Sequence, residues 1–156
     1  MHQTKKFHGV AHVNFSLREG ESDLDQQMVR DQAKDWGVSF HTIKVDTQNY
    51  AEQKGISIQM AAREIRYNFF EQLKREEGYE VLATAHHLED NIETFFINLD
   101  RGTGLKGLRG ISSTLNRFRP LLQFTKEEIY AYAEKHNIIY REDRSNADVK
   151  YQRNWF

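Results

Sequence analysis

The densest cluster of reactive side chains in this sequence follows the short apolar run at 81–85. Two imidazoles, His86 and His87, precede two carboxylates, Asp90 and Glu93, which are three residues apart and therefore share one face of a helix. Imidazoles and the N–H groups at a helix start can bind phosphate oxygens, while Asp90 can hold the accompanying magnesium ion. The alternative is a polar helix start whose acids only complement the helix dipole. Because the whole run follows an apolar strand, we favour a phosphate and metal site.

A second candidate region is rich in glycine and arginine. Four glycines within 101–110 would let the backbone approach a ligand closely, although their order is not that of a Walker P-loop. Five basic residues and no acidic one lie between 101 and 119: Arg101, Lys106, Arg109, Arg117 and Arg119. Such a basic stretch is typical of contact with RNA phosphates, and a solvated surface loop explains it equally well.

A third region, residues 142–148, concentrates Asp, Asn and Ser, and Arg153 and Asn154 follow it. Side chains of these types form turns with their own backbone, and they could equally clamp a ligand. Composition does not decide between the two interpretations.

The composition of the 156 residues narrows the class of protein. The absence of cysteine excludes disulfide scaffolds, thiolate metal sites and a cysteine nucleophile. The formal net charge is only −1, so any contact with nucleic acid must come from a local patch. No apolar run is long enough to cross a membrane and no signal peptide is recognisable, so we expect a soluble, cytoplasmic protein.

The pattern of apolar residues predicts alternating strands and helices. Strands are expected at 10–14, 40–45 and 81–85, with an edge strand at 137–140. Four helices are expected. The first begins at the N-cap Ser22 and ends near Gly37, and the second buries a face formed by Ile58, Ala62, Ile65, Phe69 and Leu73. The third contains Ile92–Leu99, and the fourth follows a capping box of Thr125 and Glu128. This order predicts a single α/β domain, a Rossmann-like parallel sheet with helices on both faces. In such a sheet, ligands bind beyond the carboxyl ends of the strands.

Six motifs together resemble those of the tRNA(Ile)-lysidine synthetases, which are N-type ATP pyrophosphatases with an adenine-nucleotide hydrolase-like fold. The motifs occur in the family's order and spacing over nearly the whole chain. They are His12–Arg18, Ala62–Tyr67, Ala85–Thr94, Arg101–Gly104, Arg119–Leu122 and Glu142–Asn146 continuing to Arg153 and Asn154.

The resemblance implies a two-step reaction. ATP adenylates the oxygen on carbon 2 of the wobble cytidine in an isoleucine tRNA with the anticodon CAU, and the ε-amine of free L-lysine then attacks that carbon. The implied cofactors are ATP and Mg²⁺, and both a monomer and a homodimer stay open. The resemblance assigns catalysis to His86, Asp90, Arg66 and Glu93, and metal binding to Asp90. The residues that it assigns to ATP binding are His12, Asn14, Arg66, His86 and Arg101. Those that it assigns to tRNA binding are Arg101, Lys106, Arg109, Arg119 and Arg153, with Asn146 and Asn154 as outer contacts.

The chain also departs from the family pattern. Phe15 stands where a second histidine is common, Glu89 where aspartate is common, and Asp100 where an apolar residue is usual. The family's Ser-Gly-Gly-x-Asp-Ser phosphate loop and its C-terminal tRNA-binding domains have no counterpart here. We therefore expect residues 1–156 to be a partial N-terminal catalytic domain that is inactive alone. Its central first strand would be missing. We expect that 10–13 and 81–85 pair directly, that a strand from a second copy is inserted between them, or that the residues are part of a larger protein that supplies the strand.

Two further classes of function stay open. One is another enzyme of the same superfamily, such as a tRNA thiolase or an amide synthetase, although the lack of cysteine disfavours a thiolase. The other is a metal-dependent phosphohydrolase built on His86, His87 and Asp90. A phosphohydrolase would need further ligands, for which His41 and His136 are the remaining candidates, and we expect both to be surface or core residues.

Overall fold

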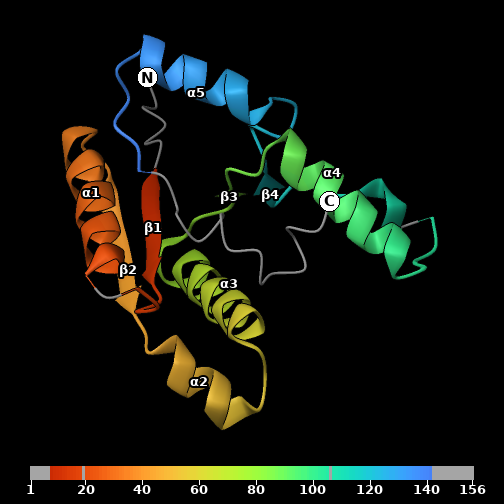
Figure 1. The fold of residues 1–156 in the computed structure, drawn as a ribbon. Coiled ribbons are helices and arrows are strands. Elements are labelled where there is room, and N and C mark those ends of the chain that lie inside the picture. The colour runs from red at the N-terminus through yellow and green to blue at the C-terminus, as the bar shows by residue number, and fades with distance from the viewer. Residues whose placement is uncertain (1–7, 19, 106, 142–156) are drawn as a thin grey trace. The chain divides into compact units, whose positions relative to one another are not determined.

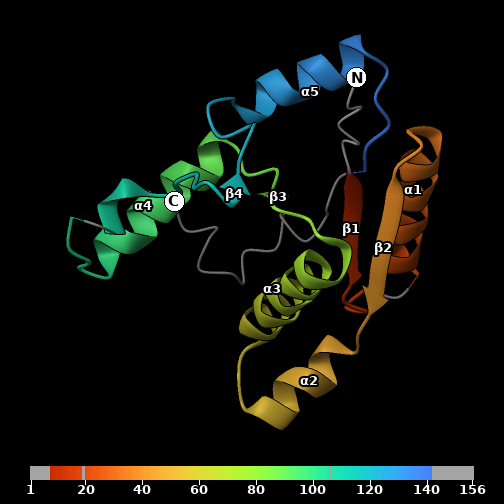
Figure 2. The ribbon, with the colours of Figure 1, turned by 180° about the vertical axis from the view of Figure 1, so that it is seen from behind.

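A computed structural model describes residues 8–18, 20–105 and 107–141 of the chain (Figures 1 and 2). The chain divides into two compact units, Met1–Glu80 and Val81–Phe156, and each is described by itself. No helix among the described residues is both long and apolar enough to cross a membrane.

The first unit is built around two parallel strands. β1 (Gly9–Asn14) and β2 (Ser39–Lys44) pair in register, with His12 opposite Thr42 and Asn14 opposite Lys44. The helix that connects them, α1 (Glu21–Asp35), completes a βαβ unit. The predicted parallel α/β arrangement is therefore confirmed in this unit.

The start of α1 differs from the prediction. Gly20, with φ of +69°, occupies the N-cap position in place of Ser22, and its lack of a side chain leaves the helix without a side-chain cap. Glu21 and Asp23 lie in the first turn, where their negative charge complements the helix dipole. The helix ends at Asp35, and the predicted glycine follows its C-cap Trp36: the N–H of Gly37, with φ of +66°, donates to the carbonyl of Lys34.

Two helices follow β2. The segment expected to be a polar loop contains a helix, α2 (Thr47–Lys54), whose N-cap Asp46 accepts a hydrogen bond from the N–H of Asn49 at 3.0 Å. The longer α3 (Ile58–Glu77) is the helix expected from the apolar pattern, although Ala61 is its buried alanine instead of Ala62.

The core of the first unit lies between β1 and α3. Val13 packs with Ile65, Phe69 and Leu73, and all four side chains are buried. Figures 1 and 2 show α1 and α3 on opposite sides of the β1–β2 pair. The two faces of this small sheet therefore have different neighbours, so that successive residues of a strand point toward different helices.

The second unit has a shorter sheet. β3 (Leu82–Ala83) pairs in parallel with β4 (Arg117–Phe118), and the remaining elements are α4 (Leu88–Asp100), the 3-10 helix η1 (Gly107–Arg109) and α5 (Lys126–Lys135). The prediction of a strand buried on both faces over 81–85 is wrong, because only two residues form the strand and Val81 is 50% exposed. The predicted capping box of α5 is confirmed, with Thr125 and Glu128 each bonding the other's backbone N–H.

The predicted edge strand at 137–140 is also wrong. Asn137 adopts a left-handed φ of +51°, and the N–H groups of Asn137 and Ile138 donate to the carbonyls of Glu134 and Ala133. These bonds end α5 with a tight turn, which uses the backbone groups that strand pairing would need. Tyr140 instead stacks on Tyr130 of α5, with ring centroids 5.3 Å apart.

The strand pairing bears on the expectation of a missing first strand. Among the described residues, the ladders join β1 with β2 and β3 with β4. The direct pairing of 10–13 with 81–85 that was one expected outcome does not occur within this part of the chain, and no other strand from it replaces the expected first strand.

Candidate functional site

The cluster at the start of α4 is organised by a helix cap. His87 is the N-cap residue, and its backbone N–H donates to Oδ2 of Asp90 at 3.0 Å. Nε2 of the His87 ring lies 3.5 Å from the same oxygen. Asp90 therefore has a structural role at the start of α4, as in the alternative interpretation, and the same hydrogen bond holds its carboxylate in one position.

Glu89 links this cluster to the next helix. Both of its carboxylate oxygens accept the backbone N–H of Lys126, the first residue of α5, at 3.1 Å, and Oε2 lies 2.9 Å from Nδ1 of His87. Partial burial works against ionisation of Glu89, but the Lys126 N–H and the His87 ring outweigh it and hold the pKa of Glu89 below its ordinary value. Sequence reasoning missed this role, although the extra methylene relative to aspartate gives the reach that it needs.

His86 is held by the loop that precedes α4. Its Nδ1 lies 2.8 Å from the hydroxyl oxygen of Thr84, and the ring is half-buried. The backbone on both sides is also fixed, because the N–H of Thr84 donates to the carbonyl of Phe118 and that of Leu88 to Phe124. An imidazole held in this way presents one defined edge, which suits binding of an anionic oxygen.

Asp90 and Glu93 are both half-buried residues of α4, one turn apart. The described residues contain no group of three or more His, Asp or Glu side chains that could enclose a metal ion. Mg²⁺, however, keeps several waters and is commonly bound by one or two carboxylates together with substrate phosphates. A single carboxylate such as Asp90 therefore fits a magnesium ion that is held jointly with a nucleotide.

The glycine-rich segment serves the backbone of the second unit itself. Gly102, with φ of +62°, follows α4, and the N–H groups of Gly102 and Thr103 donate to the carbonyls of Leu99 and Asn98. At Gly110, with φ of +64°, a Cβ would lie 2.2 Å from Oδ1 of Asn91. These two glycines are explained by a helix end and a close packing contact, without any ligand.

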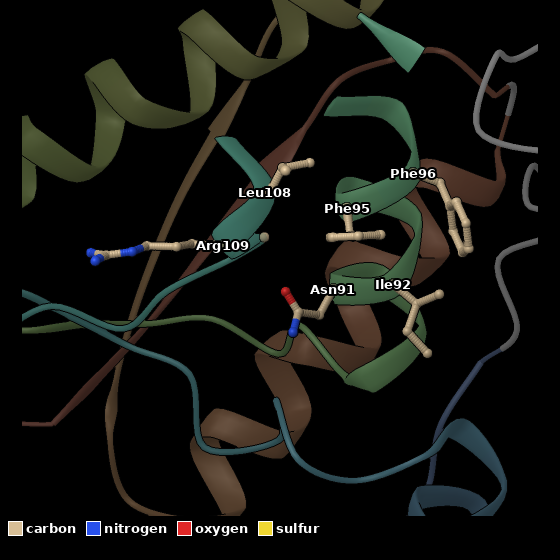
Figure 3. Close-up of a pocket in the computed structure, with 7 residues that line it drawn as sticks. Asn91, Ile92, Phe95, Phe96, Leu108 and Arg109 are labelled. Atoms are coloured by element: carbon tan, nitrogen blue, oxygen red, sulfur yellow. The ribbon is translucent and has the colours of Figure 1, made fainter. Parts of the chain in front are cut away.

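A cavity of about 360 Å³ lies beside α4 (Figure 3). Its lining is largely apolar and consists of Asn91, Ile92, Phe95, Phe96, Leu108, Arg109 and Gly110. Figure 3 shows that the Arg109 side chain points away from it. Oδ1 of Asn91 accepts the N–H of Ile111 at 2.7 Å, so the lining's other polar side chain already supports the loop. The cavity therefore lacks the convergent polar groups that orient a ligand.

The predicted tRNA-contacting residues are only partly described. Arg101 is the exposed C-cap residue of α4, and Arg109 is exposed on η1. Arg119 is half-buried and donates from Nη1 to the carbonyl of Ser112, which supports its own loop. Lys106, Arg153 and the outer contacts Asn146 and Asn154 lie outside the described residues.

In the first unit, Asn14 is a fully buried residue at the end of β1, 1% exposed. Its Nδ2 donates to Oδ1 of Asp23 at 2.7 Å and to Oε1 of Gln26 at 3.1 Å, while its Oδ1 accepts the N–H of Ser16 at 3.0 Å. Lys44 Nζ donates to the same Asp23 oxygen at 2.7 Å. Asn14 thus fixes the loop after β1 from inside, and its burial leaves its side chain little surface for contact with ATP.

His12 and Arg66, which the sequence also assigns to ATP, are associated with different faces of the β1–β2 pair. Successive strand residues alternate between faces, and Asn14, on the face of His12, bonds α1, whereas Val13 packs against α3, the helix of Arg66. Burial lowers the pKa of His12 below its ordinary value, and the Asp25 carboxylate opposes that shift. The exposed Arg66 places its guanidinium carbon 5.3 Å from the centroid of the Phe15 ring.

The two further ligand candidates, His41 and His136, have structural contacts. Nε2 of His41 lies 2.9 Å from the hydroxyl oxygen of Tyr79, and His136 is the C-cap residue of α5 with its ring 4.2 Å from that of Tyr132. They are surface or core residues, as expected. The resemblance places Arg66 and Asp90 in one catalytic set, and we expect them to line one crevice; this stays a prediction, because the two residues belong to different units.

Comparison with known proteins assigns a family. The model of the PP-loop domain family matches residues 2–156. A tRNA(Ile)-lysidine synthase of Chlorobaculum tepidum is 45% identical over 94% of this chain and 45% of its own length. Proteins of the same name from Porphyromonas gingivalis and Bacillus subtilis are 48% and 38% identical, over 93% and 94% of this chain. The chain spans 32% of the length of each of these two relatives.

A solved structure supports the fold. A U34-tRNA thiolase of Methanococcus maripaludis with its [4Fe-4S] cluster superposes with a TM-score of 0.67, covering 86% of this chain and 48% of that one. The identity is 17%, so this likeness concerns the architecture alone. The predicted α/β class, with parallel strands and helices, is confirmed by the family and by this neighbour.

Proposed function

This chain belongs to the PP-loop family, and we propose that it is catalytic-domain sequence of a tRNA(Ile)-lysidine synthase. The shared name of its relatives carries the proposal. The substrates that follow are ATP, free L-lysine and an isoleucine tRNA with the anticodon CAU, and the site of action is the cytoplasm. Both units would belong to one catalytic domain, and dimerisation stays a prediction.

The proposed chemistry has two displacements. The oxygen on carbon 2 of the wobble cytidine attacks the α-phosphorus of ATP, and pyrophosphate leaves with the electron pair of the broken phosphoanhydride bond. The ε-amine of lysine then attacks carbon 2, the bond from carbon 2 to the adenylate oxygen breaks, and AMP leaves. Both steps develop charge on phosphate oxygens, which fixed cations and donors stabilise. The target base must also be unstacked to be reached.

The start of α4 supports roles in both steps. His86, held by Thr84, is suited to a phosphate oxygen of the adenylate. Asp90, fixed by the N–H of His87, is suited to Mg²⁺ or to the ammonium group of lysine, and Glu93 lies one turn further along the same helix. Mg²⁺, when bound, would neutralise charge on the phosphates. We propose Arg101 and Arg109 as contacts of the tRNA backbone, because both are exposed.

In the first unit, we assign nucleotide contact to Arg66 and His12. Arg66 is exposed and always cationic, which suits a phosphate group. The pKa of His12 is lowered, so that its ring is largely neutral near pH 7 and can accept as well as donate a hydrogen bond. Asn14 is reassigned from ATP contact to positioning, because its amide is buried and bonded to Asp23, Gln26 and Ser16.

The other classes of function find less support. An iron–sulfur thiolase needs cysteine ligands, and none of the 156 residues is cysteine. A phosphohydrolase of the predicted kind needs a cluster of metal ligands, and the described part of the chain contains no group of three.

The direct test is whether both displacements depend on the tRNA. The complete gene product is incubated with radiolabelled ATP, lysine and a CAU-anticodon isoleucine tRNA transcript, and AMP and pyrophosphate are measured. We expect both products to depend on the tRNA. Release of AMP and pyrophosphate at the same rate without tRNA would contradict the proposal.

A further inference from the structure

Phe15 and Arg66 form a contact that the proposed roles do not explain. Phe15 follows the last residue of β1, and Arg66 lies on α3, 51 residues later in the sequence. The guanidinium carbon of Arg66 is 5.3 Å from the centroid of the Phe15 ring. This distance is within the range in which an aromatic face attracts a cation.

The position of the Phe15 ring is set by residues on both sides of it. Asn14, which precedes it, is buried and bonded to the start of α1, and its Oδ1 holds the N–H of Ser16, which follows it. Ser16 has a left-handed φ of +52°, so the chain turns at this point. The ring itself packs against the core of Val13, Ile65, Phe69 and Leu73. The Phe15 ring is therefore held in one position.

Arg66 differs from Phe15 in its exposure and in the flexibility of its side-chain type. It is an exposed residue with a long side chain, which loses much rotamer freedom when a ligand immobilises it. A guanidinium above an aromatic ring keeps the N–H groups of its planar edge for hydrogen bonds to an oxyanion. The contact with Phe15 thus restricts Arg66 before a ligand arrives, and the contact itself does not occupy the N–H donors of the guanidinium.

We propose that Phe15 is a positioning residue that preorganises Arg66 for a phosphate group of the nucleotide. This inference rests on the proposed function, since Arg66 is its proposed phosphate contact. Phe15 touches no reacting atom and acts through Arg66 alone.

The matched control is Tyr50 with Lys54. Tyr50 packs against the same core, and Nζ of Lys54 lies 5.0 Å from the centroid of its ring. Replacing Tyr50 by leucine removes an aromatic packing contact and a cation–ring contact, as Phe15→Leu does, and it also removes the hydrogen bonds of the Tyr50 hydroxyl with Lys54 and Glu64. Lys54 has no proposed role at the site, because its ammonium is paired with Glu64 at 2.5 Å.

The experiment compares Phe15→Leu, Phe15→Tyr and Tyr50→Leu in the complete gene product. For Phe15→Leu, we expect KM for ATP to rise about two- to five-fold, the loss expected for an exposed cation–ring contact, with kcat little changed. Phe15→Tyr keeps the aromatic face and should restore the wild-type KM. Tyr50→Leu should lower the melting temperature at least as much as Phe15→Leu, because it also loses the hydroxyl hydrogen bonds, but it should not raise KM. If Phe15→Leu and Tyr50→Leu had the same KM for ATP, the proposal would be overturned.

A double-mutant cycle tests whether the effect passes through Arg66. The dissociation constant of ATP is measured by calorimetry for Phe15→Leu, Arg66→Ala and the double variant, with Phe15→Met as a second variant that keeps more volume if leucine prevents folding. We expect the Phe15 effect to disappear in the Arg66→Ala background, and its persistence there would overturn the inference. Since ATP binding is measured without tRNA, a protein that shows this coupling but forms no lysidine would refute the proposed function and not the role of Phe15.

Discussion

The end of β1 and the start of α4 hold their polar side chains by different means. At the end of β1, the buried amide of Asn14 connects the loop to α1, and Val13 packs against the buried side chains of α3. At the start of α4, the side chains are held by a helix cap and by Glu89, which bonds the N–H of Lys126. Among the described residues of the second unit, only Ala133 is a buried apolar residue. Buried packing thus fixes the candidate residues of the first unit, and local hydrogen bonds fix those of the second.

From this difference we predict which substitutions lower the stability of the protein and which lower its activity. A residue in a packed core affects the whole unit, because interiors tolerate little change of volume. A residue in a helix cap affects one helix end, typically by about 1 kcal/mol. The following variants, in the complete gene product, test that separation.

The largest expected effect concerns the core. Phe69 is 6% exposed, and Phe69→Ala should lower the free energy of unfolding by about 3–5 kcal/mol, since it removes a buried ring and leaves a cavity. Phe96 of α4 is 40% exposed, and Phe96→Ala should cost about half as much or less. Urea unfolding measures both. Equal costs would remove the distinction between the two units.

The next effect separates the two roles of Asp90. In Asp90→Asn, the amide oxygen can still accept the N–H of His87, so stability should stay within about 0.5 kcal/mol of wild type while lysidine formation falls by roughly 100-fold or more. Asp90→Ala should lose the same activity and also about 1 kcal/mol of stability. Steady-state kinetics and thermal unfolding measure the two quantities. Wild-type activity in Asp90→Asn would leave Asp90 with only its capping role.

A smaller effect is expected for the buried amide. Asn14→Ala leaves the N–H of Ser16 without its acceptor and should lower the free energy of unfolding by about 1–3 kcal/mol. Thr125→Ala, which removes the cap of α5 in the second unit, should cost about 1 kcal/mol. If Asn14→Ala costs less than Thr125→Ala under the same denaturant, the buried network does not hold the first unit together.

The smallest effect is a pH dependence. Because the pKa of His12 is lowered by burial in the folded protein, the unfolded chain binds a proton more readily, and stability falls as pH drops below about 6.5. His12→Gln should therefore show a shallower decrease between pH 6.5 and the lower folded pKa. The difference in slope cannot exceed about 1.4 kcal/mol per pH unit for one proton. Identical slopes in both proteins would show that His12 does not titrate with unfolding.

Sequence reasoning succeeded where the signal was local. The capping box at Thr125 and Glu128 and the helix through Ile92–Leu99 are determined by neighbouring residues, and both were predicted. α2 was missed because its residues are polar and show no apolar periodicity, although its N-cap Asp46 was a usable signal. Ile138 and Ile139 favour strands, but the end of α5 uses the backbone N–H groups of Asn137 and Ile138 for a turn.

For the candidate site, the sequence predicted residue types and missed their contacts. His86, Asp90 and Glu93 stand out by residue type and spacing, and the helix that carries Asp90 and Glu93 was predicted. The bonds of Asn14 to Asp23 and of Glu89 to Lys126, and the contact of Phe15 with Arg66, join residues 9, 37 and 51 positions apart. Such contacts depend on how the elements pack, and neither composition nor periodicity specifies them.

The most direct test of the account is the transfer of lysine to the tRNA. The complete gene product is incubated with ATP, radiolabelled lysine and the CAU-anticodon isoleucine tRNA, alongside a matched transcript whose wobble cytidine is replaced by uridine. The account predicts that label becomes attached to the first transcript and not to the second, with mass spectrometry placing lysine on the wobble nucleoside. Absence of label from the cytidine transcript, or equal labelling of both, would contradict it.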